Sequence, residues 1–218
     1  MSAALAAPAA RIAPQALAYA QRRRAERRPV VFDLGCGGRK TPEAFGVDAV
    51  ELPGVDLVHD LRSQPYPLPG GRADEIVLHH VLEHFADPLP LLEEAWRLCR
   101  PGGVVRIRTP HYSGCYAWKD PTHRRAFSSE SFHYFGENQY SYYTSARFAV
   151  RQVRLRYLME EEQWPRLQRA FGRCVQRLLD AHPTFGERFL AYLVGGIDEL
   201  RVTLEAVKPA DGAATPPG

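Results

Sequence analysis

The sequence predicts an α/β fold whose sheet is mainly parallel. Residues 29–35 form a short apolar run that ends at a glycine, as a buried parallel strand does. Residues 88–100 place apolar side chains at helical spacing, whereas residues 200–207 alternate apolar and polar side chains like a half-exposed antiparallel strand. This succession of strands, loops and a helix is typical of helices packed on a sheet.

Further strands are expected between these landmarks. Their predicted ranges are residues 46–50, 55–59, 74–79, 104–109 and 148–158. Pro101–Gly103 is expected to end the helix before the strand at 104–109, because proline and glycine interrupt helices. The strand at 200–207 is expected to lie at or near the sheet edge.

The chain is expected to form one domain. Its 218 residues, of which 45% are hydrophobic, suffice for one buried core but are few for two. Residues 1–28 form a leader that ends in an arginine cluster, interpreted as a short helix with a solvated basic face; the alternative is a patch facing RNA or a membrane. The domain spans residues 29–208, with a helical insertion at about 160–194 that caps the sheet, and residues 209–218 are expected to be disordered.

Composition narrows the class of protein. A net charge of +3 is too small to call for a nucleic-acid partner, and no apolar run is long enough to span a bilayer. The four cysteines are scattered, which argues against a zinc site or a disulfide framework and favours a reducing compartment. The sequence therefore predicts a soluble cytoplasmic protein, a monomer or homodimer, without a membrane partner.

A glycine-rich loop follows the first strand. The segment Asp33–Gly38 contains three glycines, and glycine lets a backbone turn sharply and approach a ligand closely. An acidic residue at the end of the second strand can bind both ribose hydroxyls of a nucleotide; Asp48 is the candidate and Asp56 its rival. Only fifteen positions separate Asp33 from Asp48, so the first helix is expected to be about one turn, around Thr41–Ala44.

These and later segments resemble the successive motifs of class I S-adenosylmethionine-dependent methyltransferases, of the methyltransferase domain type 11-like kind. The motifs are Asp33–Gly37, Phe45–Asp48, His59–Leu61, Asp74–His84 and Arg100–Gly103, and the similarity covers roughly residues 30–111. The resemblance implies a Rossmann-like seven-stranded mixed sheet, mainly parallel with an antiparallel last strand, with helices on both faces. Arg39 departs from the pattern, since many relatives have a third glycine there.

The resemblance also implies a cofactor and its contacts. S-adenosylmethionine would be bound by Asp33, Gly35, Cys36 and Gly37 at its methionine part, by Asp48 at the ribose, by Asp60 and Leu61 at the adenine, and by His79 at the sulfonium side.

Candidate catalytic residues follow the fifth strand. They are His111, Tyr112, Asp120 and His123, with the aromatic segment Tyr140–Tyr143 as a wall around the acceptor. An imidazole near the methyl group could accept a proton at neutral pH, which suits a hydroxyl or ring-nitrogen acceptor. The alternative for Asp120 is that it only caps a helix running through Phe127. No metal is expected, because the His80 and His84 pair is interpreted as structural.

The predicted function is transfer of a methyl group to an oxygen or nitrogen of a small molecule, such as a specialised metabolite or a sugar. The small cap and the lack of an appended recognition domain motivate this prediction. One alternative is a methyltransferase acting on RNA or protein, with the arginine leader as anchor. Another is a non-enzymatic scaffold, against which the intact Asp33, Gly35, Gly37 and Asp48 argue.

Overall fold

The computed structural model describes residues 11–136, 143–159 and 161–208. Tyr140–Tyr142 of the expected aromatic wall, the first ten residues of the leader and the expected tail lie outside this range. Within it, no helix has the length and apolarity needed to cross a membrane.

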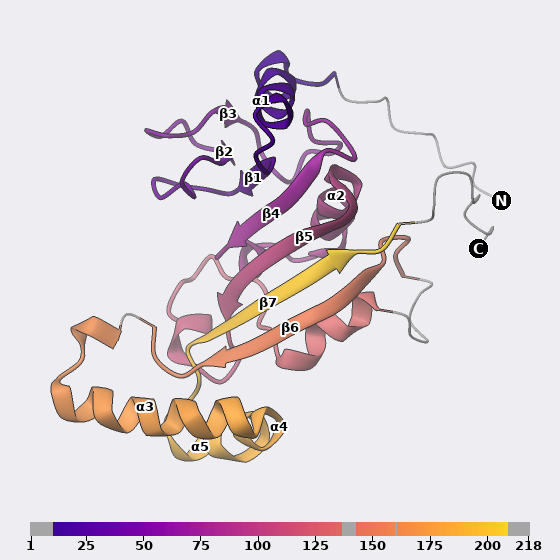
Figure 1. The fold of residues 1–218 in the computed structure, drawn as a ribbon. Coiled ribbons are helices and arrows are strands. Elements are labelled where there is room, and N and C mark those ends of the chain that lie inside the picture. The colour runs from indigo at the N-terminus through magenta and orange to yellow at the C-terminus, as the bar shows by residue number, and fades with distance from the viewer. Residues whose placement is uncertain (1–10, 137–142, 160, 209–218) are drawn as a thin grey trace.

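A seven-stranded sheet forms the centre of the protein, in the order β3-β2-β1-β4-β5-β7-β6 (Figure 1). The strands are β1 (Val31–Leu34), β2 (Phe45–Asp48), β3 (Leu57–Val58), β4 (Ala73–His79), β5 (Cys99–Pro110), β6 (Phe148–Arg156) and β7 (Glu199–Ala206). Pairing is parallel from β3 to β5, whereas β7 runs antiparallel to both β5 and β6. The predicted mixed sheet with an antiparallel last strand is confirmed, and β7 lies one strand inside the edge.

One face of the sheet packs into the apolar core. Phe32, Ile76, Val105 and Leu204 occupy paired positions on neighbouring strands, so their side chains share this face, and all are buried. Helix α2 (Leu89–Leu98) contacts β5 beside them and buries its apolar stripe.

Helix α1 (Pro14–Ala25) packs at the β1 and β2 end of the same core. The Tyr19 ring lies 5.4 Å from the ring of Phe45, and its hydroxyl donates to the Val31 carbonyl. Arg23, in the arginine-rich stretch, is buried and donates to the Pro29 carbonyl, while its neighbours on the helix are exposed.

The opposite face over β4 to β7 is polar. Its exposed or half-buried side chains include Glu75, Arg106, Arg108, Thr203 and Glu205. Two ion pairs stabilise it, between Arg106 and Glu75 and between Arg151 and Glu205, each with an N···O distance of 2.8 Å. The described helices lie elsewhere: α2 packs on the core face, and the helices after β6 lie beyond the strand ends.

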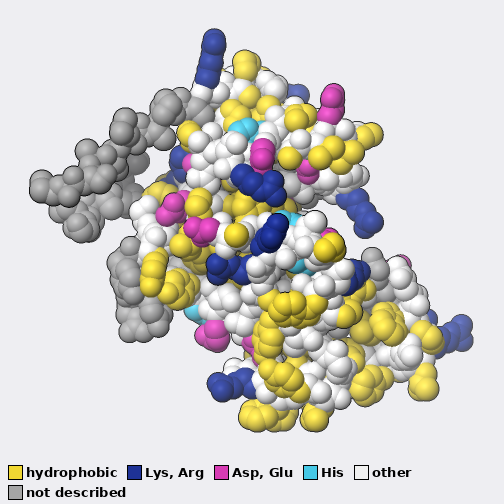
Figure 2. All heavy atoms as spheres, turned by 180° about the vertical axis from the view of Figure 1, so that it is seen from behind, with side chains coloured by type: hydrophobic (Ala, Val, Ile, Leu, Met, Phe, Trp, Pro, Cys, Tyr) yellow, Lys and Arg dark blue, Asp and Glu magenta, His cyan; other side chains and the backbone are white. Residues whose placement is uncertain are grey.

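The segment after β6 builds a cap beyond the carboxyl ends of the parallel strands (Figure 1). It consists of a 3-10 turn (Glu161–Gln163), α3 (Arg166–Ala181), α4 (Pro183–Phe185), a π-helical segment η5 (Gly186–Leu190) and α5 (Ala191–Leu193). Figure 2 shows hydrophobic side chains gathered over this cap; its exposed members include Leu167, Phe171, Phe189 and Leu193.

Three local predictions differ from the structure. Thr41–Ala44 forms a turn, with Glu43 at a φ of 63°, instead of a helical turn. Pro101–Gly103 does not end the helix, which stops at Leu98; these residues belong to β5, which begins at Cys99. Asp120 starts no helix through Phe127; its carboxylate accepts from the Thr122 backbone at 2.8 Å and closes a local turn.

Candidate active site

The loop after β1 turns back on itself through two glycines in the left-handed region. Gly35 has a φ of 73° and Gly37 a φ of 52°, conformations that favour glycine. The Gly35 N–H donates to the Val47 carbonyl at 2.7 Å, which fastens the loop to β2. A Cβ at Gly35 would lie 2.6 Å from Cγ2 of Val81, so a side chain does not fit there.

Asp48 holds the same loop from the end of β2. Its Oδ2 accepts from the Gly37 N–H at 2.8 Å and its Oδ1 from the Val50 N–H at 3.0 Å. A carboxylate has about four acceptor positions, so two remain available to hydroxyl groups. The rival Asp56 accepts from the Gly46 backbone and from Lys40, both at 2.7 Å, and thus braces the start of β2.

Asp33 and Cys36 lie beneath the loop. Burial raises the pKa of Asp33, and the Thr41 N–H, donating to its Oδ2 at 2.7 Å, partly offsets this. Burial and the nearby carboxylates raise the pKa of Cys36 to about 11, so this cysteine remains a thiol. The Cys36 thiol is therefore not a nucleophile at neutral pH.

A cleft of about 740 Å³ opens beside the loop, at the carboxyl ends of the parallel strands. The predicted cofactor residues that line it are Asp33, Gly35, Cys36, Gly37 and His79. Asp48, Asp60 and Leu61 do not line it. Leu61 borders a neighbouring hollow of about 540 Å³, and the Asp60 carboxylate accepts from the Arg62 N–H at 2.9 Å.

Two adjacent histidines at the end of β4 have opposite protonation. Burial and, to a smaller extent, the nearby Arg108 lower the pKa of His79 to about 4, so its ring is neutral at pH 7. Burial also opposes the charge on His80, but hydrogen bonds to the carboxylates of Glu199 (3.1 Å) and Glu83 (3.2 Å) outweigh it and raise the pKa to about 9.

Several basic residues line the same cleft and were not predicted. They are Arg108 on β5, Lys119 in the following loop, Arg156 at the end of β6 and Arg201 near the start of β7. Glu199 also lines the cleft and is bonded to both Arg201 and His80. Arg201 lies on a strand that the sequence predicted. The alternation of apolar and polar residues along that strand was the available signal that Arg201 lies on its polar face.

His111 and Tyr112 follow β5, as predicted, but their side chains do not line the cleft. His111 is fully buried, with Nε2 3.2 Å from a Glu187 carboxylate oxygen and Nδ1 2.8 Å from the Ser113 hydroxyl. The Tyr112 hydroxyl lies 3.2 Å from that of Tyr192 in α5. The ring of His111 therefore contacts Glu187 of the cap, and its expected role close to the transferred methyl group stays a prediction.

Asp120 and His123 form part of a polar cluster next to the cleft. The His123 Nδ1 lies 3.1 Å from the Ala117 carbonyl, and its ring contacts that of His84 at a centroid distance of 4.8 Å. Asp120 is half-buried, and its pKa is lowered by hydrogen bonds from Thr122. Glu83, His84 and His123 each offer a ligand atom within 4.8 Å of the others, a grouping that the sequence did not predict.

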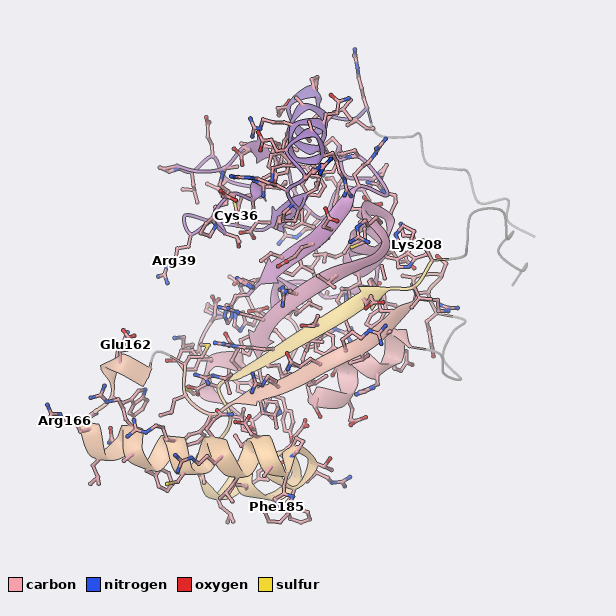
Figure 3. All side chains as sticks on the ribbon, in the orientation of Figure 1. Cys36, Arg39, Glu162, Arg166, Phe185 and Lys208 are labelled. Atoms are coloured by element: carbon pink, nitrogen blue, oxygen red, sulfur yellow. The ribbon has the colours of Figure 1, made fainter. Side chains whose placement is uncertain are left out.

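The residues around the loop fit the nucleoside cofactor that the sequence predicts. A Cβ built at Gly37 or Gly38 meets nothing within 4 Å, so the backbone is open to a ligand on that side. The cleft volume lies within the ~300–1,000 Å³ of small-molecule sites. Figure 3 shows Arg39, at the position of the missing third glycine, projecting outward from this loop.

The sheet order and the glycine loop define the fold of a class I S-adenosylmethionine-dependent methyltransferase. A family model described as a methyltransferase domain matches residues 5–174, and the chain belongs to this family.

Curated relatives match a shorter segment. The "Probable S-adenosylmethionine-dependent methyltransferase" of Mycolicibacterium smegmatis is 37% identical over 103 residues, covering 37% of this chain and 38% of that protein. A ubiquinone biosynthesis O-methyltransferase of Psychrobacter arcticus is 28% identical over 102 residues, covering 36% and 40%. The chain thus spans about two fifths of these relatives.

Solved structures show the same fold at low identity. A methyltransferase from Archaeoglobus fulgidus has a TM-score of 0.50 and 18% identity, covering 87% of this chain and 93% of that one. The [4+2]-cyclase SpnF also reaches 0.50, at 14% identity, covering 83% and 76%.

Proposed function

We propose that the protein transfers a methyl group from S-adenosylmethionine to an oxygen or nitrogen of a small-molecule acceptor, such as a specialised metabolite or a sugar. One observation carries the proposal. The glycine loop, locked by Asp48, borders a cleft at the carboxyl ends of the strands, where α/β sheets bind their ligands.

The protein's own contribution is alignment and exclusion of water. The bound cofactor supplies an activated methyl group, so the chain must hold the acceptor in line and remove a proton where the acceptor carries one. His79 suits the first task, because its neutral ring lines the cleft and can accept a hydrogen bond from the acceptor. Its pKa of about 4 makes it a weak base, which favours orienting the acceptor over full deprotonation.

The predicted catalytic set takes a supporting role in this proposal. His111 and Tyr112 connect the end of β5 to the cap through Glu187 and Tyr192, so they position the cap over the cleft. Asp120 and His123 shape the loop that carries Lys119. We propose that all four hold the acceptor side of the cleft in place.

A small acceptor is favoured over a macromolecule by the shape of the site. The cleft is of small-molecule size, and the cap stands at the edge where the acceptor would enter. The Psychrobacter arcticus relative is described as an O-methyltransferase in ubiquinone biosynthesis, which supports oxygen as the acceptor atom.

A labelled-methyl assay tests the proposal. The protein is incubated with S-adenosylmethionine labelled in the methyl group, a cell metabolite extract and, separately, total RNA and protein from the same cells. We expect label in the metabolite fraction, and a reduction of about tenfold with His79→Ala, less than the ~10²–10⁴-fold of a general base because this ring orients the acceptor. Label confined to RNA or protein would contradict the small-molecule acceptor.

A further inference from the structure

A second, smaller hollow adjoins the cleft between the end of β6 and the cap helix α3. Its volume is about 200 Å³, and it shares Arg156 and Leu158 with the cleft. Arg173 and Arg177 of α3 contribute the rest of its charged lining, and no acidic residue is among the described residues that line it. The hollow therefore presents a positive surface at the side of the cleft.

Arg156 stands at the junction with an unsatisfied donor. Its Nε is buried and has no hydrogen-bond partner within the described part of the chain. An arginine remains charged at any physiological pH, and a buried N–H donor without an acceptor is destabilising. The described residues leave this donor unsatisfied in a side chain that lines both the hollow and the cleft.

The positive charge continues from the hollow into the cleft. Arg108 and Lys119 line the cleft, and neither forms an ion pair within the described ranges. The carboxylate of Glu199 does not offset them, since it is already bonded to Arg201 and to His80, whose pKa is raised to about 9. A site lined mainly by one sign of charge concentrates ligands of the opposite sign.

We infer that the methyl acceptor carries an oxyanion group, a phosphate or a carboxylate, and that Arg156 binds this group where the hollow meets the cleft. The inference rests on the proposed function, because it names the chemical class of the acceptor. The planar guanidinium donates two parallel N–H bonds to either group. With the anion held by Arg156, the rest of the acceptor lies in the cleft, which extends to His79 and the glycine loop.

Calorimetry with simple anions tests the inference independently of turnover. Pyrophosphate and succinate serve as phosphate and carboxylate probes, titrated into the full chain in low-chloride buffer with S-adenosylhomocysteine present. We expect at least one probe to bind, and Arg156→Gln to weaken that binding by about 10- to 100-fold, as for loss of a charged hydrogen-bonding partner. Arg177→Gln should weaken it by about two- to fivefold, because this side chain is exposed.

The matched control is Arg166→Gln, which removes the same charge from the exposed start of α3, away from both hollows (Figure 3). It should leave anion affinity within about twofold, the size of a weak surface charge effect. Each variant is first checked for an unchanged thermal midpoint; if Arg156→Gln unfolds, Arg156→Lys replaces it, which keeps the charge but loses the planar fork.

Two results would overturn the inference. One is that neither probe binds the wild type, or that Arg156→Gln binds as well as the wild type. The other is that an RNA oligonucleotide binds tighter than both probes and depends on Arg156, which would assign the site to a macromolecule. Loss of S-adenosylhomocysteine binding, with anion binding still dependent on Arg156, would contradict the proposed function while the oxyanion site stood.

Discussion

His79 and His80, adjacent at the end of β4, have opposite protonation states because their surroundings differ. His79 lines the cleft, and no carboxylate of the described residues is bonded to its ring, so burial leaves it neutral. His80, one position later at a φ of 56°, lies between Glu83 and Glu199 and is charged. The contrast follows from position alone, because the two side chains have the same intrinsic pKa.

The sequence predicted His111 as a catalytic residue, but in the structure its side chain contacts Glu187 of the cap. Replacing it by alanine leaves the Glu187 carboxylate buried and without the ring nitrogen that it contacts at 3.2 Å. We expect His111→Ala to lower the free energy of unfolding by about 1–3 kcal/mol, measured by urea denaturation. His182→Ala, at an exposed position after α3, is the control and should change it little.

Measuring turnover distinguishes a structural role of His111 from the role as general base that the sequence predicted. If His111 were the base, His111→Ala would cut turnover of the folded enzyme by ~10²–10⁴-fold with cofactor affinity unchanged. We expect a loss of less than about tenfold after correction for the folded fraction, well below the effect of a general base. A loss in the larger range at full stability would restore His111 as the base.

Metal independence remains a prediction, now with a sharper test. The ligand atoms of Glu83, His84 and His123 lie within 4.8 Å of one another, but the same side chains are bonded to Thr109, Thr122 and the Ala117 carbonyl. We expect methyl transfer to be unchanged after dialysis against EDTA. Activity that disappears and returns only with zinc or magnesium would contradict this, and His123→Ala would then show whether the cluster is responsible.

At the scale of elements, the glycine loop depends on two glycines for different reasons. Both have positive φ, but an added Cβ would collide with Val81 at Gly35 and meet nothing at Gly37. A non-glycine residue in this region costs about 1–2 kcal/mol. Gly37→Ala should therefore lose about that amount of stability, and Gly35→Ala clearly more.

Chemical denaturation of the two variants measures this difference, and calorimetry with S-adenosylhomocysteine measures its effect on the site. The Gly35 variant should bind more weakly, since Val81 or the loop must move. Equal stability of the two variants would contradict the geometry at Val81.

The elements that the sequence predicted well are those with a strong local pattern. β4 and α2 were predicted within a residue or two, because a buried run and a helical stripe are both local signals. The turn at Thr41–Ala44 was predicted as one helical turn because the fifteen positions between Asp33 and Asp48 leave room for only a short helix, whereas Glu43 adopts a positive φ that no local pattern predicts.

The site residues also differ in whether a local sequence pattern predicts them. The glycine loop and Asp48 were readable from a contiguous motif, and they meet through a 2.8 Å hydrogen bond. Arg108, Arg156 and Arg201 come together only because β5, β6 and β7 are neighbours in the sheet. Long-range pairing of this kind has no local signal, so the basic side of the cleft could not be predicted from sequence.

At the scale of the whole molecule, we expect the hydrogen bonds of His80 to Glu83 and Glu199 to make the stability of the protein depend on pH. His80 connects β4 to β7 through Glu199, and its pKa is raised to about 9. A raised histidine pKa adds stability that is fully present below the unfolded value of ~6.5 and is lost as the pH rises through the folded value. The free energy of unfolding should therefore fall between about pH 6.5 and pH 9.

Urea denaturation across this range, compared with His80→Gln, isolates the contribution. The variant retains hydrogen-bonding capacity without the charge, so its stability should change less with pH. His182→Gln, at an exposed site, should follow the wild type. A wild-type profile that is flat, or identical to that of His80→Gln, would show that the network does not couple folding to pH.

The most direct test of the central claim is calorimetric titration of the purified protein with S-adenosylhomocysteine, for the wild type, Asp48→Ala and the surface control Glu205→Ala. The wild type and the control should bind equally. Asp48→Ala should bind more weakly by about 1–3 kcal/mol, because the loop loses its carboxylate and the ribose loses an acceptor. No binding by the wild type, or equal binding by Asp48→Ala, would contradict the account.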